Sequence, residues 1–224
     1  MNQFKAAWEF TFSNWKFFLA LSLPVIAIET TLGYLVLPLS DITQIEDFIS
    51  FFETNSTAIG LVGIIGMIVQ ISFLGGLWVS YMSIDTGKPI NPINALQAGL
   101  AKFFPLLGAY LILTFLIGFG LMLLILPGIY LSARFSLFAA QIMFEDNGVF
   151  QSIGSSWDKT DEYVSTLFVF TLIFMSLIFI SAIVLSSVIP DGITQVLIIS
   201  ITEVIFTIPL GYIYFTLYKS LKTS

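Results

Sequence analysis

The chain has 224 residues, of which 57% are hydrophobic and only 10% are charged, with a formal net charge of −6. A typical soluble domain has about 25% charged residues, so a soluble fold could not cover this apolar content with polar surface. The sequence contains no cysteine and no histidine, which excludes disulfides, thiolate nucleophiles and the commonest transition-metal ligands. No basic block suggests nucleic acid as a partner. We therefore expect a membrane protein that is not an enzyme and has no catalytic residues, metal or cofactor.

Six apolar stretches predict six transmembrane helices joined by short loops. The expected spans cover residues 16–39, 58–84, 104–126, 128–144, 163–189 and 193–218. Pro127 and Gly128 separate the third span from the fourth, and both residue types favour a tight reversal of the chain. A single bent helix is the alternative, but its roughly 40 residues are far too many for one crossing. The sequence thus predicts an all-α polytopic bundle that forms a single transmembrane domain over residues 1–224.

The lysines indicate how the bundle is oriented. They fall in alternate connecting segments or, for Lys16, at the first residue of a span: Lys5, Lys16, Lys88, Lys102, Lys159, Lys219 and Lys222. The remaining connections carry only acidic charges: Asp41, Glu46, Asp47, Glu53 and Asp191. With six spans all seven lysines share one side, which the positive-inside rule assigns to the cytoplasm. Both the N- and the C-terminus are then expected to be cytoplasmic.

The segment before each pair of spans predicts a short amphipathic helix, over residues 2–14, 92–103 and 148–160. In the first, Phe4, Trp8 and Phe12 recur at a spacing of four and share one helical face. Such helices lie flat at the headgroup level of a membrane. One interpretation is a threefold internal repeat, in which each unit is an interfacial helix, a span out and a span back. The other is that any short connection between spans shows such a pattern.

Three charged residues fall inside the predicted spans: Glu29, Arg134 and Glu203. Arg134 precedes Glu145 by 11 residues, which at ~1.5 Å per residue is roughly 16 Å of helix and reaches mid-membrane. A charge there costs at least ~2.5–3.5 kcal/mol, so such residues normally face the interior and form pairs. We expect Arg134 to pair with one of the two glutamates. The set is either a structural salt bridge with a spare glutamate, or a site where Arg134 binds an anion or lipid headgroup and a glutamate carries a proton.

Other polar residues extend this candidate core. Tyr130, Arg134, Gln141 and Glu145 are spaced four, seven and four apart, and so form one polar stripe along the fourth span. Gln70 provides a polar group in the second span. Helix packing and a water-filled cavity are both compatible with the stripe. The buried polar candidates are therefore Glu29, Gln70, Tyr130, Arg134, Gln141 and Glu203.

Small residues spaced four apart predict close helix contacts. Ser72, Gly76 and Ser80 form such a series in the second span, and Ser132 and Ser136 form another in the fourth. Small side chains let two helix backbones approach closely in a membrane.

The stretches 126–139 and 144–157 resemble a known pattern. Pro127-Gly128, the acidic turn from Asp146 to Gly148, and Ser155 to Trp157 are similar to the YciC family of bacterial inner-membrane proteins. They are also similar to the membrane domain that accompanies some glycerophosphodiester phosphodiesterases. The resemblance implies a multi-pass inner-membrane protein of poorly defined role, with no catalytic residues to transfer. The phosphodiesterase domain of those relatives is absent from this sequence.

Together these observations predict a non-enzymatic multi-pass protein of the bacterial cytoplasmic (inner) membrane with an envelope or lipid-related organising role. Membrane lipids are the expected partners, and the sequence identifies no protein partner. The alternative is a small transporter or lipid-handling protein that uses a core of Glu29, Arg134 and Glu203.

Overall fold

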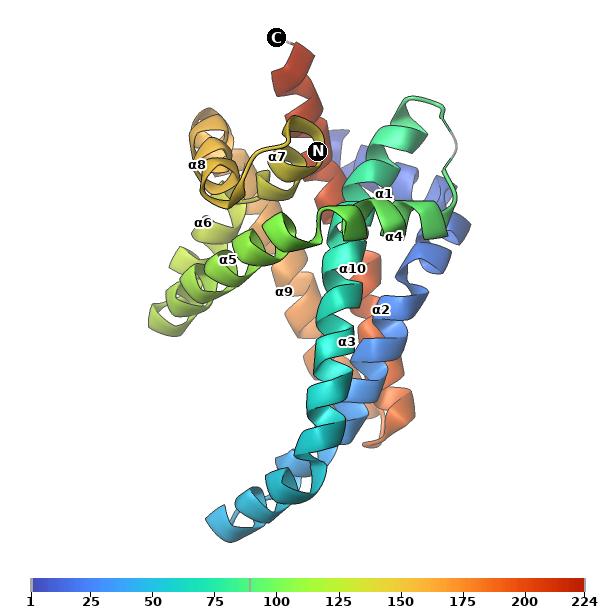
Figure 1. The fold of residues 1–224 in the computed structure, drawn as a ribbon, viewed down its shortest axis with the longest axis vertical. Helices are drawn as coiled ribbons and strands as arrows, with labels where there is room; N and C mark the ends of the chain where they lie inside the picture. Colours follow the sequence, from blue (N-terminus) through green and yellow to red (C-terminus); the bar gives the residue numbers. More distant parts are fainter. Residues whose placement is uncertain (1, 89, 224) are drawn as a thin grey trace.

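The computed structural model describes residues 2–88 and 90–223, and these residues form helices joined by short connections (Figure 1). Six helical segments are long and apolar enough to cross a membrane: Trp15–Asp41, Ile45–Asp85, Phe103–Leu123, Ile125–Glu145, Asp161–Val188 and Ile193–Lys222. The predicted all-α polytopic bundle with about six membrane helices is therefore confirmed.

The order of elements repeats three times along the chain, each time as a short helix followed by a long antiparallel pair. The first unit contains α1 (Asn2–Ser13), α2 (Trp15–Val36) with the 3-10 turn η1 (Leu37–Asp41), and α3 (Ile45–Asp85). The second contains α4 (Pro92–Ala101), α5 (Phe103–Leu123), α6 (Ile125–Arg134) and α7 (Phe138–Glu145). The third contains α8 (Val149–Lys159), the 3-10 turn η2 (Asp161–Tyr163), α9 (Val164–Val188) and α10 (Ile193–Thr223).

Each short helix packs against the long helices of another unit, so that the three units form a ring. Helix α4 lies across α3 and α2, α8 packs against α5 and α7, and α1 packs against α10. Between the units, α3 contacts α5, α6 contacts α9, and α10 returns to contact α2. The short helices, the start of α1 and the end of α10 all lie toward one end of the molecule, which we call the terminal face (Figure 1).

Small residues make these cross-unit contacts possible. Each short helix buries a pair spaced four apart, and these pairs are Ala7 and Thr11, Ala95 and Gly99, and Ser152 and Ser156. A Cβ atom on Gly99 would collide with the backbone of Ser72 and Gly76 on α3. The small residues of the second span therefore pack against α4 rather than against another membrane-crossing helix.

Two helices differ from the predicted spans. Helix α3 begins at Ile45, 13 residues before the expected span 58–84, and its N-terminal end projects beyond the bundle (Figure 1). Glu46 and Asp47 lie in its first turn, where carboxylates favourably oppose the positive end of the helix dipole. The expected fourth span, 128–144, is divided between α6 and α7.

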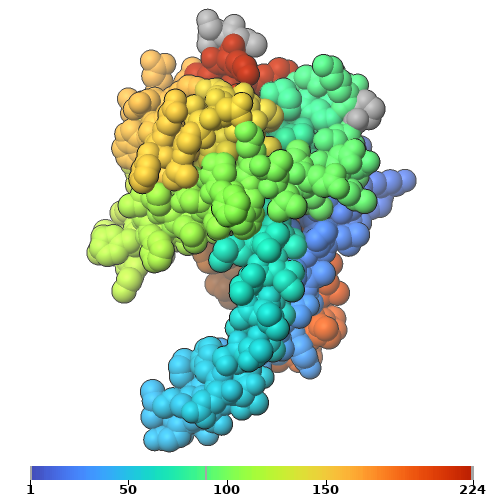
Figure 2. Space-filling view, in the orientation of Figure 1, coloured from blue at the N-terminus to red at the C-terminus, as the bar shows by residue number. Residues whose placement is uncertain are grey.

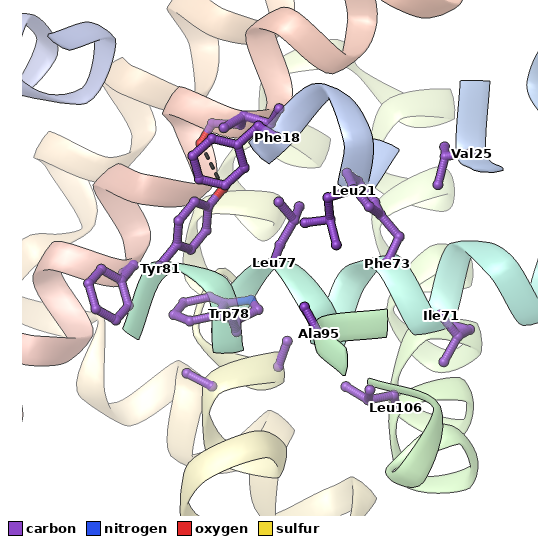
Figure 3. Close-up of a cluster of buried hydrophobic side chains, with 14 of the residues drawn as sticks. Phe18, Leu21, Val25, Ile71, Phe73, Leu77, Trp78, Tyr81, Ala95 and Leu106 are labelled. Atoms are coloured by element: carbon purple, nitrogen blue, oxygen red, sulfur yellow. Dashed lines mark hydrogen bonds between the residues drawn. The ribbon is translucent and has the colours of Figure 1, made fainter. Parts of the chain in front are cut away.

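The main core lies where α2, α3, α4 and α10 meet near the terminal face. Figure 3 shows Phe18, Leu21, Leu77 and Tyr81 in this cluster, with Ala95 of α4 beside α3. The fully buried Tyr81 donates a hydrogen bond of 2.7 Å to the Ile208 carbonyl on α10. This contact joins the first unit to the third.

Candidate functional site

The break between α6 and α7 is held by hydroxyl groups from the third unit. The Oγ of Ser156 on α8 accepts a hydrogen bond of 3.0 Å from the Leu137 N–H and donates one of 3.0 Å to the Arg134 carbonyl. Thr160 donates a second bond, of 2.9 Å, to the same carbonyl. A helix break exposes backbone groups that need partners, and α8 supplies those partners here.

Arg134 lies at this break, at the last residue of α6. Its side chain is only 2% exposed. The guanidinium donates a hydrogen bond to the carboxylate of Asp161 in η2 and lies 4.1 Å from the centre of the Trp157 ring. The Nε atom is buried without a hydrogen-bond partner among the described residues. The partner of Arg134 is therefore Asp161, and the expected pairing with Glu29 or Glu203 is wrong.

Glu29 lies on α2 and Glu203 on α10, two helices that pack against each other. The Oε2 atom of Glu29 is enclosed without a hydrogen-bond partner among the described residues, whereas Glu203 is exposed on the surface of α10. Arg134 belongs to a different network, with Asp161 and Trp157.

Gln141 connects α7 to α8. It is fully buried, and its Oε1 accepts hydrogen bonds of 3.2 Å from Asn147, 2.8 Å from Ser155 and 3.1 Å from Lys159. Lys159 also binds Glu145 at 3.0 Å. Three donors on one oxygen fix α8 against α7, so Gln141 acts in packing.

Tyr130 and Gln70 occupy less enclosed positions. Tyr130 is 38% exposed and meets the Trp157 ring edge-on, with 6.2 Å between the ring centres. Gln70 is half-buried on α3. The six candidate residues are therefore distributed over several places and do not form one polar core.

The bundle contains a cavity of about 310 Å³ between α3, α5, α6, α9 and α10. None of the six candidate residues lines it. Its walls are formed by Leu74, Leu77, Trp78, Tyr81, Tyr110, Leu113, Thr114, Ile117, Ser132, Phe135, Ser136, Phe138, Thr171, Met175, Thr207, Leu210, Gly211 and Tyr214. Ser132 and Ser136, which were expected in a helix contact, face this central cavity.

Apart from the Trp78 indole, the polar side chains that line the central cavity carry hydroxyls, and none of the lining side chains is charged. Thr171 and Tyr214 share a hydrogen bond of 2.7 Å, and the Ser132 hydroxyl bonds the Gly128 carbonyl of its own helix. The Ser136 Oγ is buried and has no hydrogen-bond partner among the described residues. The cavity therefore presents mainly apolar walls with a few hydroxyl groups.

Comparison with known proteins gives one curated relative. The chain is 34% identical over 91 residues to "UPF0259 membrane protein plu2479" of Photorhabdus laumondii. The match covers 41% of this chain and 36% of the relative, so it spans only about a third of that protein. No family model and no solved structure matches the chain. The relative and the six apolar helices identify a multi-pass membrane protein.

Proposed function

We propose that this protein is a non-enzymatic, lipid-organising component of the bacterial cytoplasmic membrane, with both termini in the cytoplasm. The sequence supports membership of a YciC-like family, since its resemblance to that family includes the region of the α6–α7 break. The absence of histidine and cysteine removes the usual general base and the thiol nucleophile. The proposed role then depends on the helical scaffold and its contacts with lipid rather than on a catalysed reaction.

One observation carries this proposal: each of the three short helices presents apolar side chains away from the bundle. Phe12 on α1 is 61% exposed, Ile93 on α4 is 66% exposed, and Phe150 on α8 is 80% exposed. On the other side of each short helix, the buried pair of small residues described above packs against the bundle. Helices with one anchored side and one exposed apolar side lie at the headgroup boundary, so three of them would contact lipids around the terminal face.

The distribution of ion pairs supports a cytoplasmic terminal face. Lys219 at the end of α10 binds Asp85 at the end of α3, and Lys102 before α5 binds Asp146 after α7. These pairs join helix ends at the terminal face, where the chain's lysines concentrate. Lysine-rich connections remain on the cytoplasmic side of a membrane.

The transporter alternative would require a polar path to Arg134. The central cavity is lined by apolar and hydroxyl groups, and the Arg134 guanidinium is bound to Asp161 outside it. A charged solute in the cavity would therefore lack an opposite charge, which is costly in a low-dielectric interior. This arrangement favours lipid contact over transport of polar solutes.

Nitroxide labels in the cysteine-free chain test the membrane position of the short helices. Phe150→Cys on α8 and Phe115→Cys on α5 provide a matched pair, because the native side chains are 80% and 79% exposed. Electron paramagnetic resonance with oxygen and a water-soluble nickel chelate measures label depth. We expect a shallow label at position 150 and a deep label at position 115. Equal depths, or a label at 150 that is fully in water, would contradict the interfacial role.

The orientation is tested separately with Ser50→Cys and Gln97→Cys, which are exposed positions at opposite ends of the molecule. A membrane-impermeant maleimide applied to intact spheroplasts should label position 50 and leave position 97 unlabelled until the cells are lysed. The reverse pattern would overturn the proposed cytoplasmic location of the termini.

A further inference from the structure

The central cavity opens sideways, at the level of α5. Thr114 lines the cavity wall and is nevertheless exposed, so the wall is incomplete at this residue. The neighbouring side chains on the outer surface are apolar: Phe115 is 79% exposed and Phe119 is 63% exposed. An opening surrounded by exposed aromatic residues on a membrane helix faces lipid rather than water.

The hairpin of α5 and α6 packs on the bundle through α3 and α9, but its tip extends beyond the other helices. Figures 1 and 2 show it as a wing directed away from the lower part of α3. The tip contains only apolar residues, and Met122, Leu124 and Ile125 are 87%, 70% and 67% exposed. The wing is therefore suited to hydrocarbon, and the space beside it is accessible to lipid chains.

The chemistry of the cavity limits what can enter. Its volume of about 310 Å³ lies near the lower end of the ~300–1,000 Å³ typical of small-molecule sites. That space accommodates a segment of one flexible hydrocarbon chain, but not an entire phospholipid. Apolar walls favour such a chain.

We infer that the central cavity binds an acyl chain of a membrane lipid, which enters laterally beside the α5–α6 hairpin. This inference builds on the proposed lipid-organising function and gives it a specific site. The chain lies among Ile117, Met175 and Leu210. Thr114 is at the entrance, where a larger side chain would obstruct entry.

Photolabelling in defined vesicles tests this site. The protein is reconstituted in phosphatidylethanolamine and phosphatidylglycerol with a trace of phosphatidylethanolamine that carries a diazirine in mid-chain. After illumination, mass spectrometry locates the adducts. We expect adducts at the cavity residues Ile117 and Met175 in addition to those on exposed faces. Adducts confined to exposed faces would overturn the inference.

Variants separate occupation of the cavity from general lipid contact. Thr114→Phe should lower the cavity adducts on the order of tenfold, which corresponds to ~1.4 kcal/mol of lost binding. Leu116→Phe is the matched control, because Leu116 is on α5, is 44% exposed and does not line the cavity; it should leave the adducts unchanged. Equal effects of the two variants would overturn the proposed entrance.

The label depth at position 150 distinguishes the two proposals. Cavity adducts with a label at 150 in water would reject the interfacial role alone, whereas a shallow label without cavity adducts would reject the acyl-chain site alone.

Discussion

Replacing Ser156 by alanine removes the hydroxyl that bridges the α6–α7 break. Ser156 is fully buried and bonds both the Leu137 N–H and the Arg134 carbonyl, each at 3.0 Å. The carbonyl keeps its bond from Thr160, but the N–H loses its acceptor. An unsatisfied buried donor costs about 1–3 kcal/mol, and we expect Ser156→Ala to lower the free energy of unfolding by that amount.

Ser152→Ala is the matched control on the same helix. Ser152 is also fully buried, but its hydroxyl bonds only the Val149 carbonyl of its own helix, at 2.7 Å. Its replacement should change stability by less than about 0.7 kcal/mol, because alanine has the better helix propensity. Both variants are compared by reversible unfolding in mixed micelles, followed by circular dichroism. Equal stabilities would refute the capping role of Ser156.

A double variant refines this test. Thr160→Val alone leaves the Arg134 carbonyl bound to Ser156, whereas Ser156→Ala with Thr160→Val removes both hydroxyl partners. Residues that share one partner show interaction energies of about 0.5–3 kcal/mol. The double variant should therefore be less stable than the sum of the single effects predicts, and strict additivity would show that the two hydroxyls do not share this carbonyl.

Glycine substitutions test two other contacts. Gly99→Ala should destabilise the protein by about 1–3 kcal/mol, because the added Cβ meets the Ser72 carbonyl. Gly154→Ala is the control, because the added Cβ would meet no neighbouring atom within 4 Å. It should stabilise the protein by about 0.5–1 kcal/mol. Thermal unfolding of the two variants checks the order, and equal shifts would contradict close packing of α4 on α3. Gly211→Ala should cost about 1–3 kcal/mol, because its Cβ would lie 2.6 Å from the Tyr81 hydroxyl. Adding Tyr81→Phe should recover part of that loss, and an additive double variant would argue against this contact.

The sequence predicts the large elements well because they depend on local composition. Long apolar runs specify helices whatever helices they later pack against. Asn91 followed by Pro92 is a recognisable helix start, and in the structure the Asn91 side chain accepts a hydrogen bond from the Asn94 N–H. The early start of α3 could also have been found, because Glu46 and Asp47 in succession mark the first turn of a helix. The apolar run alone does not reveal this start, because Glu46 and Asp47 lie outside it.

The site is harder to predict because the expected mid-membrane depth of Arg134 requires an unbroken helix from Arg134 to Glu145. In the structure α6 ends at Arg134 and the chain turns before Phe138. The turn brings Arg134 to Asp161, 27 residues later in the sequence. Ser156 on α8 and Thr160, which directly follows α8, are the available signal. Hydroxyl spacing alone does not identify the backbone groups that those side chains contact.

The ring of three units has a consequence for biosynthesis. Helix α1 is made before α9 and α10, yet its aromatic residues Phe4 and Trp8 pack on Phe174 of α9, and Trp8 also meets Phe206 of α10. During translation α1 therefore lacks these partners until the α9–α10 hairpin has been inserted. The three units emerge one after another, but the ring closes only when the third is in place. Chains stalled before α10 would leave this aromatic surface uncovered.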